Sequence, residues 1–482
     1  MMAVTKRLQA QLLTLGKVRQ AASLLSMGKY MRIGLIVVVV LAMLVGTALA
    51  GASWWIMSKM GPDVWVEQLE KNCDCRAHVG HAELSLLSSP ARLRFLDVKI
   101  APRDAEVAKP LSDRAPLPEG SAPIAIPEIV FEVKLEDLMN KRLFVQNLRI
   151  ISPVVREIQD DQGKGSLEAL FRKPNKIQPE AAQKPVPGPV AAKPESKPAV
   201  AKDKQDYAFS AHSASIERGL ITVTNKKMQV KISELDLTLS DIDVDTTNLA
   251  EHNRVRASLS SLIEVMGEAR IGGVKRPVQL ANVKLSGESN VVPMDPVTQS
   301  WAPTSTLKLT LAQGSVLAGH MTMGDVAGKE MKKLQEYGVD LSPVKIGGAL
   351  LEPAIMDATF KNNRLTLRKH TRFALPEYEV VLHQSSWLDS AKDQHELELK
   401  LSCGASLQTR LQKGIAKAKL GDSLASAVIK ALSDERGRMT FDIESKGSLS
   451  EPSVRPKIDR LLKNLIRGEG LGDLFKGLLK KL

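Results

Sequence analysis

Apolar and polar residues alternate with a period of two along most of this chain, and helical spacing is rare. Such alternation is the pattern of a half-buried β-strand, because successive side chains point to opposite faces. About fifteen such runs can be counted, which predicts a mainly β protein. The clearest are ARLRFLDVKI (91–100), KISELDLTLSDIDV (231–244), STLKLTL (305–311), NRLTLRK (363–369), HELELKLSC (395–403) and RMTFDIES (438–445).

One-residue slips interrupt the alternation in several of these runs. The apolar positions change phase between Phe95 and Val98, after Ile232, and again after Leu239. A single extra residue of this kind is typical of a β-bulge, which bends the strand. We therefore expect a curved sheet.

Alternation gives every strand one apolar face, and that face has to be covered. Besides an apolar run near the amino terminus, helical patterns are limited to 325–338, 411–432 and the tail from Pro456 to Leu482. These cannot cover about fifteen strands. The sheet must therefore pack on itself as a sandwich, close as a barrel, or leave an apolar trough. An apolar trough in water implies a lipid-like ligand.

Residues 33–57 contain no charged side chain and are long enough to span a bilayer as a helix. Residues 1–32 carry basic side chains and no acidic ones, so the amino terminus is expected in the cytoplasm and the bulk of the chain outside it. Ala48-Leu49-Ala50 has the small-x-small pattern of a signal-peptidase site, which leaves cleavage as an alternative. The long basic leader and the apolar run past Ala50 favour an anchor.

The net charge of +13 is concentrated in three segments. Residues 1–32 carry +6, residues 172–204 carry +5, and residues 455–482 carry +5, so the remainder is close to neutral. A protein that follows a phosphate backbone needs basic side chains on its folded surface. No nucleic-acid partner is therefore expected.

A segment rich in proline and lysine at 173–204 cannot bury enough apolar surface to order itself. It divides the exported part into a first β-rich segment, 58–172, and a main β-rich domain, 205–454, which includes the helix at 411–432. A basic amphipathic segment, 455–482, follows. Its two apolar stripes meet at Gly468-Glu469-Gly470, and it serves either as an end cap on the last strands or as a contact with an anionic membrane surface.

Four segments, in order, carry a resemblance to a known family. They are HAELSLLSSPARLRFLDVKIAP; KRLFVQNLRIISPVVREIQDDQGKGSLEALF, centred on Pro153, Gly163 and Leu170; AFSAHSASIERGLITVTNKKMQVKISELDLTLSDIDV; and MTFDIESKGSLSEPSVRPKIDRLLKNLI, with Gly447 and Pro452. Together they resemble the AsmA-like proteins, which are anchored in the inner membrane of diderm bacteria and lie in the periplasm. The chain departs from the family pattern at Gly-Lys-Gly-Ser, where an Asn often follows the glycine, and in its pair of cysteines near residue 74.

The resemblance implies an elongated, curved, mostly antiparallel sheet with an apolar concave face and a few carboxy-terminal amphipathic helices. It also implies a single-pass protein of the inner (plasma) membrane that takes part in outer-membrane biogenesis and handles lipid. The implied partners are membrane lipids and, in an alternative that carries no lipid, outer-membrane assembly or envelope proteins. In that alternative the protein regulates the assembly or targeting of outer-membrane proteins.

The stretch CDCRAHVGHAEL raises the question of a metal or redox site, because Cys73, Cys75, His78 and His81 lie close together. On a strand the two histidines point to opposite faces unless a bulge at Gly80 realigns them, which argues against a shared metal. The cysteines are expected to be bonded locally or to serve as small residues.

The third cysteine, Cys403, lies on an apolar strand face and is expected in a core. No signature of a nucleotide-binding loop, a zinc protease or a serine hydrolase is found in the sequence. The remaining histidines (212, 252, 320, 370, 383, 395) are scattered singly, and SDIDVD at 240–245 lacks the glycine and terminal Glu of a calcium loop. We expect no enzyme, with no catalytic, cofactor-binding or metal residues. An uncharacterised hydrolase remains the third hypothesis.

The predicted topology can be tested with a reporter fused after Leu482. An alkaline phosphatase reporter, which folds only in an oxidising exported compartment, should be active there, because the basic leader keeps residues 1–32 inside. A fluorescent protein that matures only in the cytoplasm is the matched control and should stay dark. The opposite pair of signals would overturn the orientation.

Overall fold

The structure is a computed structural model, and the part that it describes lies between residues 62 and 457. Within those limits it leaves out 86–89, 119, 135–142, 161–164, 173–208, 227, 246–247, 272–273, 318–321, 324–334, 336–337, 390, 418–421 and 449–451. The predicted membrane span at 33–57, the leader, the Pro- and Lys-rich segment and nearly all of the amphipathic tail therefore lie outside the described residues.

The described part is mainly β, as predicted, with twenty strands in one sheet and few helices. In the first half the strands are β1 (Cys75–Ser85), β2 (Ala91–Pro102), β3 (Ile124–Val133), β4 (Leu143–Ile151), β5 (Val154–Ile158), β6 (Phe209–Thr224), β7 (Met228–Val244), β8 (Asn253–Ile271), β9 (Val274–Met294) and β10 (Trp301–Leu311). The second half has β11 (Val316–Leu317), β12 (Gly348–Ala349), β13 (Ala354–Lys361), β14 (Arg364–Leu367), β15 (Thr371–Ala374), β16 (Tyr378–Leu382), β17 (Trp387–Asp389), β18 (Gln394–Cys403), β19 (Thr440–Ser448) and β20 (Pro452–Pro456).

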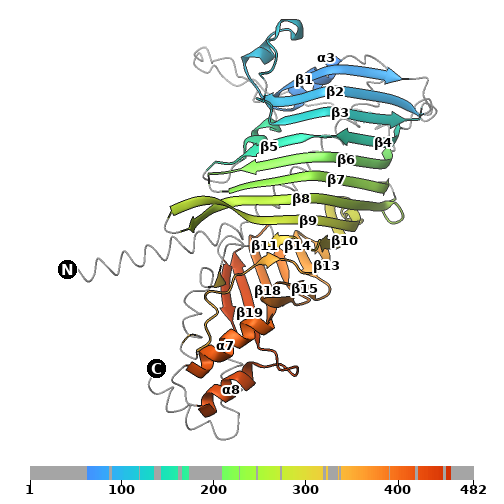
Figure 1. Ribbon diagram of the computed structural model, residues 1–482. Coiled ribbons are helices and arrows are strands. Elements are labelled where there is room, and N and C mark those ends of the chain that lie inside the picture. The colour runs from blue at the N-terminus through green and yellow to red at the C-terminus, as the bar shows by residue number, and fades with distance from the viewer. Residues whose placement is uncertain are drawn as a thin grey trace, which may run out of the picture.

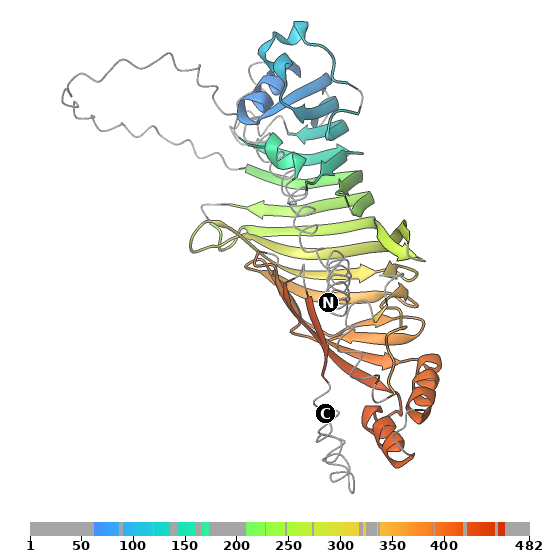
Figure 2. The same ribbon diagram turned by 90° about the vertical axis from the view of Figure 1, so that its left-hand side faces the viewer.

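Neighbours in sequence are mostly neighbours in the sheet, and they pair antiparallel. The strands stack along one long axis, from β1 at the blue end to β19 near the red end, which makes the molecule elongated (Figures 1 and 2). The described helices are α3 (Pro62–Asn72), α5 (Ser166–Leu170), α7 (Ala405–Lys417) and α8 (Asp422–Leu432), with short 3-10 turns at Ala105–Ala108 and Leu111–Asp113.

One junction departs from the antiparallel order. Both β4 and β5 pair with β6 in the parallel sense, so that Leu143 faces Phe209 and Ile158 faces Thr224. Parallel neighbours need a crossover connection. The chain between β5 and β6, which includes α5 and the Pro- and Lys-rich segment, makes this crossover. Strands from both sides of that segment therefore belong to one sheet.

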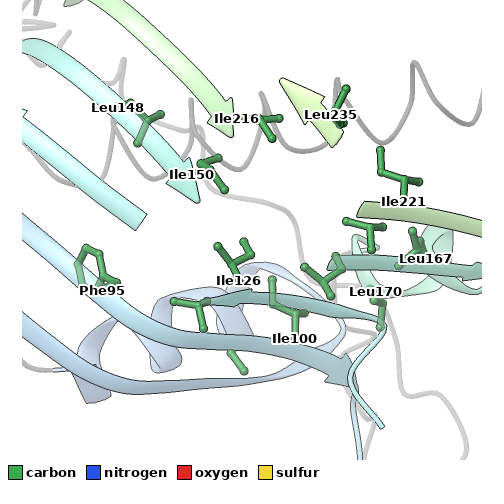
Figure 3. Close-up of a cluster of buried hydrophobic side chains, with 14 of the residues drawn as sticks. Phe95, Ile100, Ile126, Leu148, Ile150, Leu167, Leu170, Ile216, Ile221 and Leu235 are labelled. Carbon is green, nitrogen blue, oxygen red and sulfur yellow. The ribbon is translucent and has the colours of Figure 1, made fainter. Parts of the chain in front are cut away.

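A first buried core covers one face of the sheet from β1 to β9. Figure 3 shows side chains of β2, β3, β4, β6, β7 and α5 converging on it, among them Leu167 and Leu170 of α5. Helix α3 adds Trp65, whose ring lies edge-on to Phe95 at 4.9 Å between centroids. The helices thus cover the sheet near its amino-terminal end.

A second buried core lies at the other end of the sheet. There α7 packs on β18 and α8 lies against α7, and the chain around Val339–Leu350 completes the layer. Leu407, Leu411 and Ile415 recur at helical spacing on α7 and are fully buried, which explains the amphipathic pattern in the sequence.

The predicted phase slips coincide with residues that have a positive φ. Asp97, Glu234 and Asp241 each have a positive φ, between 51° and 55°, and the pairing of β7 with β8 shifts register around the last two. A residue in this conformation turns the following side chain to the other face, so the apolar face stays on one side across each slip. The interpretation of the slips as bulges is confirmed at Glu234 and Asp241, whereas at Asp97 the pairing of β2 with β1 and β3 keeps its register and no residue is inserted.

The helix predicted over 411–432 was wrong in its bounds. The structure has two helices, α7 and α8, and the first begins at Ala405, directly after β18 and Gly404. In the sequence, Gly421 favours the end of one helix and Asp422 the start of the next. The spacing of apolar residues alone does not show this boundary. Most of the helix predicted at 325–338 lies outside the described residues.

Helix α7 supplies a test of this packing. A Cβ added at Gly414 would lie 2.6 Å from the carbonyl oxygen of Gly338. Alanine is a better helix former than glycine by about 1 kcal/mol, but this contact with backbone should cost more, about 1–3 kcal/mol. Gly414→Ala should therefore lower the denaturant midpoint of the full chain, followed by circular dichroism. The control Ser406→Ala, at an exposed position of α7, should not lower it.

Candidate functional site

A row of directly paired residues crosses the middle of the sheet on its apolar face. Leu237 of β7 pairs with Leu259 of β8, Leu259 pairs with Gly287 of β9, and Gly287 pairs with Leu309 of β10. Directly opposed residues on neighbouring strands point to the same face. The row therefore carries leucine side chains from three of its four strands.

A second row runs beside the first. Leu239 pairs with Ala257, Ala257 with Ser289, and Ser289 with Leu307, while Leu285 lies two residues before Gly287 on the same face. We call the six leucines of these rows the leucine stripe: Leu237, Leu239, Leu259, Leu285, Leu307 and Leu309.

Gly287 keeps the stripe continuous. A Cβ at this position would meet Cδ2 of Leu309 at 2.5 Å. The Leu309 side chain thus lies over the backbone of β9, where a larger residue would have to displace it. The absence of a side chain at Gly287 is what lets neighbouring leucines close the gap.

All six leucines of the stripe are only half-buried. Leu237 and Leu259 pack against the margin of the first core, whereas Leu239, Leu285, Leu307 and Leu309 belong to neither core. Among the described elements, the main helix-to-strand contacts fall on β1, β2, β5 and β18. The stripe is therefore an apolar surface between two covered ends, and contiguous surfaces of this kind mark binding sites.

The opposite face of the same strands is polar and hollowed. Two adjoining hollows, of about 340 and 520 Å³, share Ser258, Glu288 and Lys308. Their other lining includes hydroxyl groups such as those of Thr238 and Thr306. The sequence pattern predicted a trough on the apolar face. These hollows lie on the opposite face, which the same pattern assigned to solvent. Leu259 and Leu307 of the leucine stripe also contribute to the lining, but most of it is polar, which does not favour an apolar ligand.

The metal hypothesis for residues 73–81 was tested against the geometry of β1. The burial pattern changes phase at Gly80, so His78 and His81 both lie on the exposed face, which is the realignment at Gly80 that the sequence left open. Each ring nevertheless faces its own carboxylate, His78 near Asp97 at 3.6 Å and His81 near Glu83 at 3.9 Å. Among the described residues, no three His, Cys, Asp or Glu side chains form a group that could hold a metal ion.

Of the two alternatives expected for the cysteines, a local disulfide or unbonded small residues, the structure shows the second. All three are free thiols, with Cys73 half-buried and Cys75 and Cys403 buried. Cys403 belongs to the second core, as predicted, and burial raises the pKa of its thiol to about 12. A local disulfide between Cys73 and Cys75 is not present.

The structure also brings together residues that sequence spacing left apart. His395 Nε2 lies 2.7 Å from the Ser445 hydroxyl oxygen, and burial lowers the pKa of this histidine. The exposed fractions are 2% for His395 and 5% for Ser445, so the pair has no access for a substrate and serves as a polar contact of the interior. His370 and His383 were thought to be isolated, but their ring centroids lie 5.0 Å apart.

The acidic run at 240–245 lies on β7 as a solvated strand face. Asp243 faces His252 at 2.8 Å and Arg254 at 3.2 Å, and Asp241 faces Arg256 at 3.4 Å. Two of its three aspartates, Asp241 and Asp243, therefore have basic or imidazole partners on or next to β8.

No protein-family model, curated protein or solved structure matches this chain. The resemblance to the AsmA-like proteins therefore rests on the four sequence segments alone. Within the described residues, no helix has the length and apolar character to cross a membrane, and the span predicted at 33–57 lies outside them.

The stripe should tolerate substitution better than either core. Leu307→Ala removes a half-buried side chain and should lower the free energy of unfolding by about 1 kcal/mol. Leu401→Ala, at a fully buried position of the second core, should cost about 2–5 kcal/mol. Denaturant unfolding of both variants provides the comparison. Equal losses would mean that Leu307 is part of a packed core.

Proposed function

We propose that this protein is anchored in the inner membrane and takes part in outer-membrane biogenesis by holding or passing lipid acyl chains on the leucine stripe. The observation that carries the proposal is the position of Leu285, Leu307 and Leu309, which are half-exposed on central strands and outside both cores. Central strands are where a sheet is normally covered best. An apolar face left open there favours an apolar ligand.

An acyl chain suits the form of the stripe. The leucine rows run across the strands, along the long axis of the sheet (Figure 1), and span four strands, or about 15 Å at the usual strand spacing. Each methylene group removed from water contributes about 0.8 kcal/mol. A chain laid along the rows gains this contribution at every carbon and needs no hydrogen-bonding partner.

The predicted anchor supports an envelope location. Residues 33–57 precede α3, which begins at Pro62, so α3 and β1 are the described elements closest in sequence to the membrane. The rest of the chain then lies in the periplasm. From there an elongated sheet can present an apolar surface at a distance from the bilayer that supplies its lipid.

A second candidate function is regulation of outer-membrane protein assembly or targeting without lipid. The observation in its favour is the turn between β9 and β10, where Val297 is 88% and Trp301 is 66% exposed. The Asp295 carboxylate accepts hydrogen bonds from the Val297 and Thr298 amides, which fixes the turn. A fixed turn with exposed apolar side chains is suited to a protein partner.

The two functions can be separated by photo-crosslinking. A photoreactive phenylalanine analogue at Leu307 or Leu309 should crosslink to lipid in cells that have been fed a labelled fatty acid. The matched controls are Thr306 and Lys308, which neighbour these leucines on β10 but point to the polar face. They should show little crosslinked lipid under the same conditions.

Equal labelling from both faces would mean that the stripe does not select lipid. No lipid labelling from Leu307 and Leu309, together with a protein crosslink from Val297, would instead support the regulatory function. The label is read after extraction of free lipid, so a signal reports a covalent product.

A further inference from the structure

The two cysteines that set this chain apart from the family pattern lie at the joint between α3 and β1. The Cys73 amide donates to the Leu69 carbonyl at 2.8 Å as the last turn of α3 ends. The Asp74 amide donates to the Arg172 carbonyl at 2.8 Å, and Cys75 is the first residue of β1. The backbone is therefore held on both sides of Cys73.

An arginine fixes this bend from the side. Arg103 Nε lies 3.0 Å from Asp74 Oδ1, and the same guanidinium donates to the carbonyls of Cys73, at 3.3 Å, and Glu70. The bend thus has backbone and side-chain restraints, and a permanent positive charge lies beside both cysteines. The charge is paired with Asp74, and it lowers the pKa of Cys75 by less than the hydrogen bond with Cys73 and burial raise it.

The two thiols differ in access. Cys75 is 1% exposed, whereas Cys73 is half-buried and can be reached from solvent. A hydrogen bond from the Cys75 thiol lowers the pKa of Cys73 to about 7, while that hydrogen bond and burial raise the pKa of Cys75. An accessible nucleophile therefore lies next to a protected second thiol, which is the arrangement of attacking and resolving cysteines.

We propose that Cys73 and Cys75 form a redox-active dithiol that closes to a local disulfide by exchange with the disulfide of a thiol oxidoreductase. The Cys73 thiolate attacks one sulfur of the partner disulfide, which forms a mixed disulfide and releases one partner thiolate. The Cys75 sulfur then attacks Cys73, and its proton passes to the departing second partner thiolate. The first partner thiolate takes up the proton that Cys73 released to solvent when it ionised, so the partner leaves as a dithiol. The protein loses two electrons and two protons, and the partner gains both.

The spacing permits this bond. Residues two apart in the chain have Cα atoms no more than about 7 Å apart, and the bend at Asp74 shortens that distance. A disulfide needs about 4.4–6.8 Å. Closure would join the end of α3 to the start of β1, and so stiffen the joint that follows the predicted membrane span. The proposed export of the chain matters only for the natural oxidant, and the chemistry does not depend on lipid binding.

The test uses the purified full chain in detergent with oxidised and reduced glutathione. After an acid quench and alkylation, peptide mass spectrometry should show that the wild type loses two hydrogen atoms within the Cys73–Cys75 peptide and carries no glutathione. Cys75→Ser should accumulate glutathione on Cys73, because the resolving thiol is missing. Cys73→Ser should react slowly, because Cys75 is buried.

Cys403 is the internal control, since it is buried and its thiol has a raised pKa. In the folded wild type, alkylation of Cys73 should be at least about tenfold faster than that of Cys403 and should rise with pH around 7. A wild type that stays reduced, or that keeps a stable glutathione adduct on Cys73, would overturn the proposal. Both outcomes are read on the wild type, so they do not depend on the folding of a variant.

Discussion

The structure depends on how one long apolar face is covered by too few helices. Every strand contributes side chains to this face, and a sheet of this length exposes more apolar area than four described helices can bury. Of the helices that the structure describes in full, α3 and α5 lie at one end and α7 and α8 at the other. The middle, from β7 to β10, keeps half-exposed leucines. The candidate site is thus a consequence of where the covering elements are, and not of any special motif.

The amino-terminal end is held by more than apolar packing. Glu70 of α3 is buried, accepts from the Ala77 amide of β1 at 3.1 Å, and forms a two-pronged ion pair with Arg114 at 2.8 and 3.0 Å. Removing one partner of such a buried ion pair leaves the other charge without compensation and lowers the free energy of unfolding by several kcal/mol. At the opposite end, β20 has proline at both of its ends, which limits pairing with another strand.

The sequence predicted this fold wherever the signal was local. Alternation identified the strands, and the slips at Glu234 and Asp241 identified the bulges, because both are properties of a few consecutive residues. The parallel pairing of β4 and β5 with β6 could not be predicted, since it joins segments separated by the Pro- and Lys-rich region. The apolar face of the candidate site was predictable in kind. Its location was not, because that depends on which strands α5 and α7 cover.

The continuity of the apolar face bears on whether a lipid is held or passed along. Leu235, in the first core, is followed on the same face by Leu237, and Leu285 leads through Leu311 to the fully buried Ala354 of the second core. The stripe therefore ends in packed side chains in both directions. An acyl chain on β7 to β10 can be held without any change in the cores. Passage along the whole sheet requires that a covering element move away from the apolar face. Helix α5 has five residues and buries Leu167 and Leu170, so it is a smaller barrier than α7 and α8 together. Under the proposed function, holding a lipid would need no change in the structure, whereas transfer would require a second state in which one core is open.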